Sequence, residues 1–142
     1  IFHVQHLAAQ PDSPIFTPGT PYVELNDAVR PAPGERVIRK HFPNSFQQTT
    51  LLADLQAAGV GHAVIVGAMS HMCIDATTRA ASDLGFRCTL LHDACATRDL
   101  EFAGKRVAAE DVHASFMAAL GWWYARLRSA DEFLRSPDEP AR

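Results

Sequence analysis

The stretch that decides the fold is HAVIVGAMSHMCIDATTRAASDLG, residues 62–85. Its apolar, β-branched run at 64–66 predicts a strand buried on both faces, and a turn of mostly small residues follows at 67–70. From Cys73 onward, apolar residues recur at helical spacing until Gly85 supplies the stop. A cysteine therefore lies where a buried strand turns into a helix.

This position favours a chemical role for Cys73. In an open α/β sheet, ligands bind at the carboxyl ends of the strands. At the first turn of a helix, unpaired N–H groups and the positive end of the dipole also favour a thiolate. The competing interpretation is that Cys73 is a small buried hydrophobe, the commonest role of an intracellular cysteine. The coincidence of strand end and helix start favours the nucleophile.

The composition indicates a single domain over residues 1–142. A net charge of −3 gives no electrostatic footprint for nucleic acid or an anionic membrane, and no apolar run approaches the roughly 20 residues that span a bilayer. The three cysteines show no C-x-x-C spacing and cannot all pair within the chain, which favours a reducing, cytoplasmic setting. The chain opens on an apolar run at Ile1 without a methionine, which predicts a cut rather than a natural start.

Strands and helices alternate along the rest of the chain. Strands are predicted at residues 1–4, 36–41, 87–92 and 125–128. Helices are predicted at residues 46–58 and 108–120. The expected irregular segments are the proline-rich loop 10–33, the strand-end loop 93–98 and the polar tail 136–142. The alternation predicts a mostly parallel α/β sheet. The long loop is expected either to have a function or only to cross the surface of the sheet.

Local signals set the helix ends. Ser45 is predicted to be the N-cap of the first helix. Gly121 and the two tryptophans after it are expected to interrupt the second. Ser129 with Glu132 matches a capping box, which predicts a short terminal helix.

Several polar residues could share the sheet edge of Cys73. Lys40 ends the predicted strand 36–41 and could hold a thiolate by its charge, although a solvated lysine is the alternative. His71 is two residues from the cysteine, so the two side chains would not face each other, and a place in the pocket wall or on the surface is expected. Asp93 is expected to cap the following turn or to contact substrate. The seven histidines form no ligand cluster, so no metal site is predicted.

Three segments together carry a resemblance to a known family. They read VIVGAMSHMCIDATTRAASDLGF, TLLHDACATRDLEF and VHASFMAAL, in this order. They resemble the isochorismatase-like cysteine hydrolases, whose pattern G-x-x-[TS]-x-x-C-[VI] is matched by Gly67, Ser70, Cys73 and Ile74. The family's upstream region supplies a lysine, and here Lys40 precedes the tripeptide 44–46. The resemblance implies a Rossmann-like three-layer sandwich with a mostly parallel sheet in the order 3-2-1-4-5-6.

The resemblance also implies a catalytic triad of aspartate, lysine and cysteine. Cys73 would attack a carbonyl, the aspartate would take its proton, and Lys40 would orient both. A cis peptide bond would fall at Ala68–Met69 and aim the N–H of Met69 alongside that of Cys73, forming an oxyanion hole. The expected residues of the substrate pocket are Phe42, Phe46, Ser70 and His71.

One part of the family pattern is absent from this sequence. The triad aspartate lies in the family's first strand, and that strand and the helix after it have no counterpart here, so no residue is expected to inherit the aspartate's role. An isochorismatase-like domain without this strand would expose unpaired edges on both neighbouring strands. The sequence therefore predicts an N-terminally incomplete domain, completed by a longer polypeptide or by another chain.

The cysteine favours the amide branch of the family. The expected reaction is hydrolysis of a small amide or ureide through a thioester. The alternatives are a vinyl-ether (isochorismate-type) hydrolase, a catalytically inactive binding module and a redox-active thiol protein. Nicotinamidase-type relatives carry a metal site after the second strand, but residues 6–10 do not offer it, so neither a metal nor a cofactor is expected. The resemblance also implies a homodimer or homotetramer, with Trp122 and Trp123 either at the contact or in a core or hinge.

Overall fold

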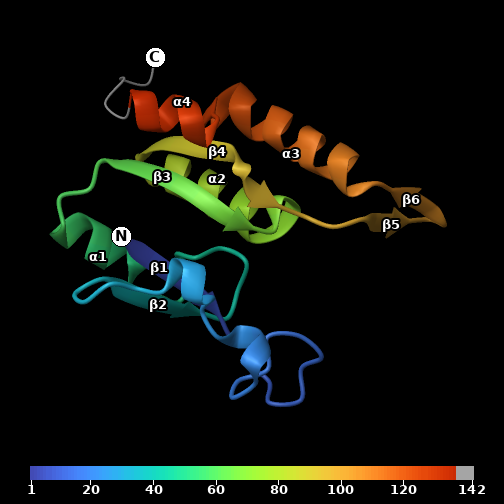
Figure 1. Cartoon of the computed structure of the whole chain (residues 1–142), viewed down its shortest axis with the longest axis horizontal. Coiled ribbons are helices and arrows are strands. Elements are labelled where there is room, and N and C mark those ends of the chain that lie inside the picture. Colours follow the sequence, from blue (N-terminus) through green and yellow to red (C-terminus); the bar gives the residue numbers. More distant parts are fainter. Residues whose placement is uncertain (137–142) are drawn as a thin grey trace.

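The computed structural model describes residues 1–136, in which parallel strands form two small sheets (Figure 1). The first sheet pairs β1 (Phe2–His6) with β2 (Arg36–Lys40). The second contains β3 (His62–Ala68), β4 (Arg87–Ala96) and β7 (Arg126–Arg128), in the order β3-β4-β7. Every pairing within these two sheets is parallel, so the predicted α/β class is confirmed. The tail beyond residue 136 lies outside the described residues.

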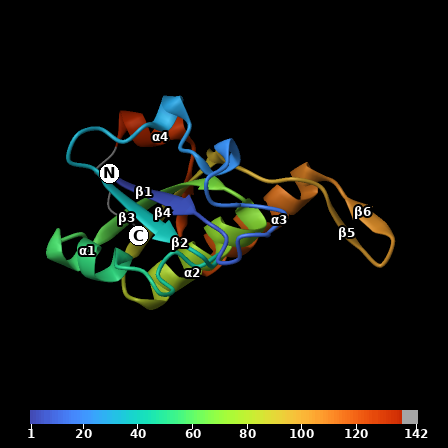
Figure 2. The ribbon, with the colours of Figure 1, turned by 90° about the horizontal axis from the view of Figure 1, so that it is seen from below.

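The helices cover both faces of the strands. They are α1 (Leu51–Ala57), α2 (Asp75–Asp83), α3 (Ala109–Trp123) and α4 (Ala130–Arg135). Figure 2 shows the strands between α2 on one side and α4 on the other, which is the predicted three-layer arrangement. The long loop 10–33 is confirmed, with only two short 3-10 turns at Pro21–Val23 and Asp27–Val29. The helices of the described residues include none that is long and apolar enough to cross a membrane.

The main core joins the second sheet to α3. Leu90 of β4 and Leu120 of α3 are fully buried, and Ile74 and Met117 complete the cluster. Full burial of a leucine side chain stabilises the fold by roughly 1.5–3 kcal/mol relative to exposure. The core therefore fixes the carboxyl ends of β3 and β4 relative to the helices that follow them.

A groove of about 450 Å³ separates the two sheets. No hydrogen bond pairs β1 with β3 among the described strands, and apolar side chains from both line the groove. Val64 and Val66 of β3 are 40% and 53% exposed, although the sequence predicts a strand buried on both faces. The orders β2-β1 and β3-β4-β7 match segments 3-2 and 4-5-6 of the expected sheet, and the full order remains a prediction.

The segment before α1 differs from the sequence prediction. The helix begins at Leu51 rather than at residue 46, and Ser45 is not its N-cap. Instead, the buried hydroxyl of Ser45 hydrogen-bonds the Thr77 hydroxyl at 2.9 Å, which ties this segment to α2. Gln48 has φ of 55°, a left-handed conformation that no helix interior accommodates. The apolar periodicity of this region therefore overestimates the length of the helix.

The strand ends also differ from the prediction. β1 continues past Val4 to His6, and β3 continues through the predicted turn to Ala68. β4 extends to Ala96 rather than ending at His92, because after an irregularity in register it pairs again with the end of β3. These extensions bring more residues to the carboxyl edge of the strands than the sequence indicates.

The interruption predicted at Gly121 is wrong, because α3 continues through both tryptophans to Trp123. A Cβ atom at Gly121 would lie 2.8 Å from Cδ1 and 2.9 Å from Cγ of Leu127. The glycine thus allows α3 to approach β7 closely, rather than ending the helix. The capping box at Ser129 is confirmed, since its hydroxyl accepts from the Glu132 N–H at 3.1 Å and the Glu132 carboxylate accepts from the Ser129 N–H at 2.8 Å.

A β-hairpin that the sequence analysis missed projects from the body (Figures 1 and 2). It consists of β5 (Leu100–Phe102) and β6 (Lys105–Val107), which pair in antiparallel fashion. Ala103 and Gly104 both have positive φ, as a type I′ turn requires. Strands of three residues carry too little alternation to be recognised, and alanine is an unusual residue at such a turn.

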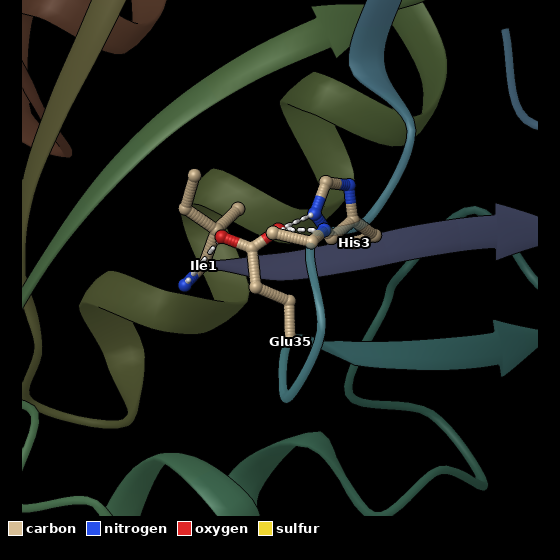
Figure 3. Close-up of polar contacts among 4 residues, drawn as sticks. Ile1, His3 and Glu35 are labelled. Atoms are coloured by element: carbon tan, nitrogen blue, oxygen red, sulfur yellow. Dashed lines mark hydrogen bonds and ion pairs between the residues drawn. The ribbon is translucent and has the colours of Figure 1, made fainter. Parts of the chain in front are cut away.

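A carboxylate fastens the start of β1 to the turn before β2 (Figure 3). Glu35 accepts from the Ala32 N–H at 2.9 Å and pairs with Nε2 of His3 at 2.7 Å. Its other oxygen lies 3.6 Å from the amino group of Ile1. The bond to His3, followed by the bond to Ala32, lowers the pKa of the Glu35 carboxyl.

Candidate active site

Cys73 lies in a π-helical turn, Ser70–Ile74, between β3 and α2. The carbonyl of Met69 accepts hydrogen bonds from the N–H groups of Met72 at 3.0 Å and Ile74 at 3.2 Å, which wraps the turn around residue 73. The peptide bond Ala68–Met69 immediately before the turn is cis. The thiol is partly exposed, as an attacking sulfur must be. The strand-to-helix position inferred from the sequence is therefore where the structure places this cysteine.

Lys40 lies at the end of β2 and is only 3% exposed. Its ammonium donates a hydrogen bond to the carbonyl of Pro43 at 2.6 Å. Burial lowers the pKa of Lys40. A Cys73 thiolate partly opposes this shift, first by its negative charge and then by a hydrogen bond to the lysine. A solvated lysine at a strand end is thus excluded, and the structure brings Lys40 and Cys73 into electrostatic contact.

A cleft of about 600 Å³ opens over the cysteine. Ala68, Met69, His71 and Cys73 form one wall at the end of β3. The cleft is also lined by residues that follow β1, namely Ala8 and Ala9, and by Gln10, Ser13, Ile15 and Phe16 of the long loop. The loop therefore helps to build the cleft and is more than a surface excursion. The volume suits a small molecule, for which protein pockets of about 300–1,000 Å³ are usual.

Three of the residues expected in the pocket lie elsewhere. Phe46 packs in the core of the first sheet and lines the groove between the sheets. Ser70 is fully buried and hydrogen-bonds Nδ1 of His113 at 2.8 Å, which joins the turn that holds Cys73 to α3. Phe42 is half-buried and does not line the cleft. Only His71 of this expected set lies in the wall.

His71 is held at the rim of the cleft by two contacts. Its Nδ1 hydrogen-bonds the Thr97 hydroxyl at 2.5 Å, and its ring meets the edge of Phe116. Burial, and then the charge of Arg98, lower the pKa of His71, so the ring is neutral at pH 7. Asp93 does not contact the cleft, because its Oδ1 accepts from the Ala130 N–H at 2.8 Å and so supports the start of α4.

The sequence analysis missed His6, the last residue of β1. Its Nδ1 lies 3.7 Å from Sγ of Cys73, and its ring stacks on Phe16 at 4.3 Å between centroids. The available signal was the F-H-V-Q-H alternation, which continues two residues beyond the predicted strand end. Because β1 is parallel to β2, His6 pairs in register with Lys40 and therefore reaches the same edge.

The charges around the cleft are positive or neutral. Arg98 lines it, and none of the residues described as lining it is an aspartate or glutamate. Within residues 1–136, no group of three or more histidine, cysteine or acidic side chains is placed to hold a metal ion. Arg98 therefore makes the electrostatic potential of the cleft more favourable for an anionic group than for a cation.

These features define an α/β protein with a cysteine-bearing cleft at the carboxyl ends of parallel strands. The isochorismatase domain model matches residues 1–120. The uncharacterized isochorismatase family protein YddQ of Bacillus subtilis (strain 168) is 47% identical over 135 residues, which are 95% of this chain and 75% of YddQ. A solved structure of an isochorismatase from Pseudomonas putida KT2440 has a TM-score of 0.85 and 36% identity, and the match covers 93% of this chain and 67% of that one. The chain belongs to the isochorismatase family of hydrolases.

Two further relatives have named activities. Streptothricin hydrolase of Streptomyces noursei is 38% identical over 132 residues, which are 93% of this chain but only 45% of the relative. Ureidoacrylate amidohydrolase of Variovorax paradoxus (strain S110) is 31% identical over 114 residues, which are 80% of this chain and 41% of that protein. These names describe the relatives and indicate that amide hydrolysis occurs within the family.

Proposed function

We propose that this chain hydrolyses a small amide or ureide through a thioester on Cys73. The observation that carries the proposal is the thiol at the base of a cleft, in electrostatic contact with a buried lysine. The relative that is named an amidohydrolase supports an amide rather than a vinyl ether as the substrate. The cleft volume of about 600 Å³ supports a small-molecule substrate.

In the proposed chemistry, the thiol proton passes to the family's triad aspartate, which has no counterpart in this sequence and which returns the proton to the leaving nitrogen. The residues of this chain have the following roles. The sulfur of Cys73 attacks the amide carbonyl, and the N–H groups of Met69 and Cys73 stabilise the oxyanion of the tetrahedral intermediate. The Lys40 ammonium stabilises the thiolate by its charge, and its bond to Pro43 holds it in place. Collapse of the intermediate releases ammonia or an amine, and water then cleaves the thioester. This chemistry needs no cofactor.

The test is a panel of small amides and ureides, assayed for release of ammonia or amine. Cys73→Ala is expected to abolish turnover, and hydroxylamine is expected to trap the wild-type thioester as a hydroxamate. Cys95→Ala is the matched control, because this half-buried thiol lies outside the cleft wall and its variant should retain activity. Full turnover by Cys73→Ala would discard the nucleophile role of Cys73. Absence of turnover on every substrate would favour an inactive binding module.

We also propose a cytoplasmic homodimer or homotetramer. Free thiols at all three cysteines fit a reducing compartment. Trp122 and Trp123 are 88% and 79% exposed beside a hollow of about 480 Å³, which supports a contact between copies and argues against a core role. Light scattering coupled to gel filtration measures the mass in solution, and a monomer at every accessible concentration would contradict this assembly.

A further inference from the structure

Two elements outside the cleft hold the turn that carries Cys73. They are the end of β4 and one face of α3. Both contact the turn at two consecutive residues, Ser70 and His71. In the sequence, these residues lie between Met69 and Cys73, whose N–H groups are proposed to bind the oxyanion. Contacts at 70 and 71 can therefore set the direction of those N–H groups.

Ser70 makes the first pair of contacts. Its side chain is fully buried, and its hydroxyl lies 2.8 Å from Nδ1 of His113 on α3. The same hydroxyl donates to the carbonyl of Ala96 at the end of β4, at 3.3 Å. A serine hydroxyl has only one proton. Because that proton points to Ala96, Nδ1–H of His113 is the donor to Ser70, and a chain of hydrogen bonds runs from α3 through the turn to β4.

His71 repeats this arrangement one residue later. Its Nδ1 hydrogen-bonds the Thr97 hydroxyl, which follows β4, and its ring meets the edge of Phe116 with 6.2 Å between the ring centroids. On α3, the two contact residues His113 and Phe116 are three positions apart, so they share one face of the helix. The same two elements therefore hold the turn at two successive residues.

The start of α3 is itself tied to the segment after β4. Asp99 accepts from the Ala109 N–H at 2.8 Å, and its other oxygen accepts from Nε of Arg106 at 2.9 Å. Further along the helix, Met117 belongs to the same buried cluster as Leu90 of β4. Because α3 is fixed in this way, a side chain that reaches from it to the turn can fix the turn as well.

We propose that His113 is a positioning residue for the oxyanion hole. Through its hydrogen bond to Ser70, it holds the N–H groups of Met69 and Cys73 in the direction of the developing oxyanion. This inference rests on the proposed amide hydrolysis, in which those groups stabilise the tetrahedral intermediate. His113 is not among the described residues that line the cleft, so it acts only through the turn. Because an oxyanion forms only on the way to the transition state, loss of this support lowers kcat and leaves KM almost unchanged.

Two substitutions separate this role from a packing role. In His113→Asn the amide nitrogen is bonded to Cγ, as Nδ1 is in histidine, so an N–H donor stays close to its present position. In His113→Gln the side chain is one carbon longer, and the amide group takes the place of Nε2 instead. Glutamine is the better helix former of the two. A loss that is confined to His113→Gln therefore cannot result from a weaker helix.

Two reagents measure the effect on Cys73 without an amide substrate. p-Nitrophenyl acetate acylates the sulfur through a tetrahedral intermediate, whereas iodoacetamide alkylates it by direct displacement and forms no oxyanion. Acylation is followed as the release of p-nitrophenolate that Cys73→Ala abolishes, and alkylation by mass spectrometry of the Cys73 peptide. The ratio of the two rates is expected to fall about 10- to 100-fold in His113→Gln, because a misplacement of about 1 Å can cost about 100-fold. In His113→Asn the ratio is expected to stay close to that of wild type.

Equal ratios in the two variants would overturn the inference, and so would wild-type protein that is not acylated at Cys73. A measurement on wild type guards against a variant that does not fold. Nitrogen NMR of the neutral imidazole is expected to show the His113 proton on Nδ1, because the Ser70 hydroxyl can only accept from it. A proton on Nε2 with a bare Nδ1 would exclude the chain of hydrogen bonds.

Amide turnover distinguishes this inference from the proposed function. If wild type hydrolyses amides, His113→Gln is expected to lose about 10- to 100-fold in kcat with little change in KM, and His113→Asn to retain most of the activity. If no amide is hydrolysed but the ratio of acylation to alkylation still depends on the Nδ1 donor, the positioning role stands and the reaction class is wrong. If amide turnover is the same in wild type and His113→Gln, the reaction class stands and the role of His113 is wrong.

Discussion

Gly121→Ala is predicted to destabilise the protein, although alanine is the better helix former. The gain in helix propensity is about 0.5–1 kcal/mol. Against it, the new methyl group would lie 2.8 Å from Cδ1 and 2.9 Å from Cγ of Leu127. Rotating the end of the leucine moves Cδ1 but leaves Cγ in place, so the whole side chain must shift. Because Leu127 packs on the core around Leu90 and Leu120, such overpacking costs typically 1–3 kcal/mol.

The net expectation is a loss of about 1 kcal/mol, or a few degrees in the unfolding midpoint of a domain of this size. Urea unfolding followed by circular dichroism measures it. Gly61→Ala is the control, because its Cβ would meet nothing within 4 Å. The double variant Gly121→Ala/Leu127→Ala should show a favourable coupling of at least 0.5 kcal/mol, since the shortened side chain makes room. Gly121→Ala with wild-type stability or better, or no coupling in the double variant, would refute the overpacking argument.

Two further predictions concern thiol reactivity and acid stability. Burial raises the pKa of Cys88 to about 11, so only about 3 in 10,000 of its thiols are ionised at pH 7.5. Native iodoacetamide labelling, mapped by mass spectrometry, should therefore modify Cys73 and spare Cys88; comparable labelling of both would contradict the burial of Cys88. The lowered pKa of Glu35 means that its bonds stabilise the fold above the unfolded value of 4.5, and this contribution is lost as the pH falls through the folded value. Melting temperatures between pH 7 and 3 should fall less steeply in Glu35→Gln than in wild type, whereas parallel curves would exclude a role for the carboxylate.

The parts of the fold that were predicted correctly depend on local signals. The capping box at Ser129 supplies hydrogen-bond partners for the first N–H groups of α4 from residues next to them in the sequence. Gly85 has a left-handed φ of 90° and ends α2, as predicted from the sequence. Long-range contacts account for the errors. Ser45 hydrogen-bonds Thr77, 32 residues away, instead of capping a helix. Gly121 was predicted to interrupt a helix because the local sequence pattern does not show its close contact with Leu127.

The candidate site divides in the same way. Lys40 could be predicted because it ends a recognisable strand, and Cys73 because it lies where a strand turns into a helix. Parallel strands end at the same edge of a sheet, so the topology brings the two residues together. His6 was missed because the strand was ended two residues early, and Phe46 was misplaced because family-like spacing says nothing about which groove an aromatic ring faces. Phe16 could not be found at all, since it lies in an irregular loop and meets His6 only through the tertiary structure.

The charge arrangement of the cleft follows from the parallel topology. Because β1 and β2 run in register, a histidine and a buried lysine arrive together at one edge, and β3 brings the cysteine turn to the same edge. Burial, and then the positive charge of Lys40, lower the pKa of His6. Burial also lowers the pKa of Lys40, and the negative charge of a Cys73 thiolate opposes that shift. A positive charge on His6 is therefore disfavoured beside Lys40. The parallel register of β1 and β2 therefore places a half-buried histidine and a buried lysine beside the cysteine turn.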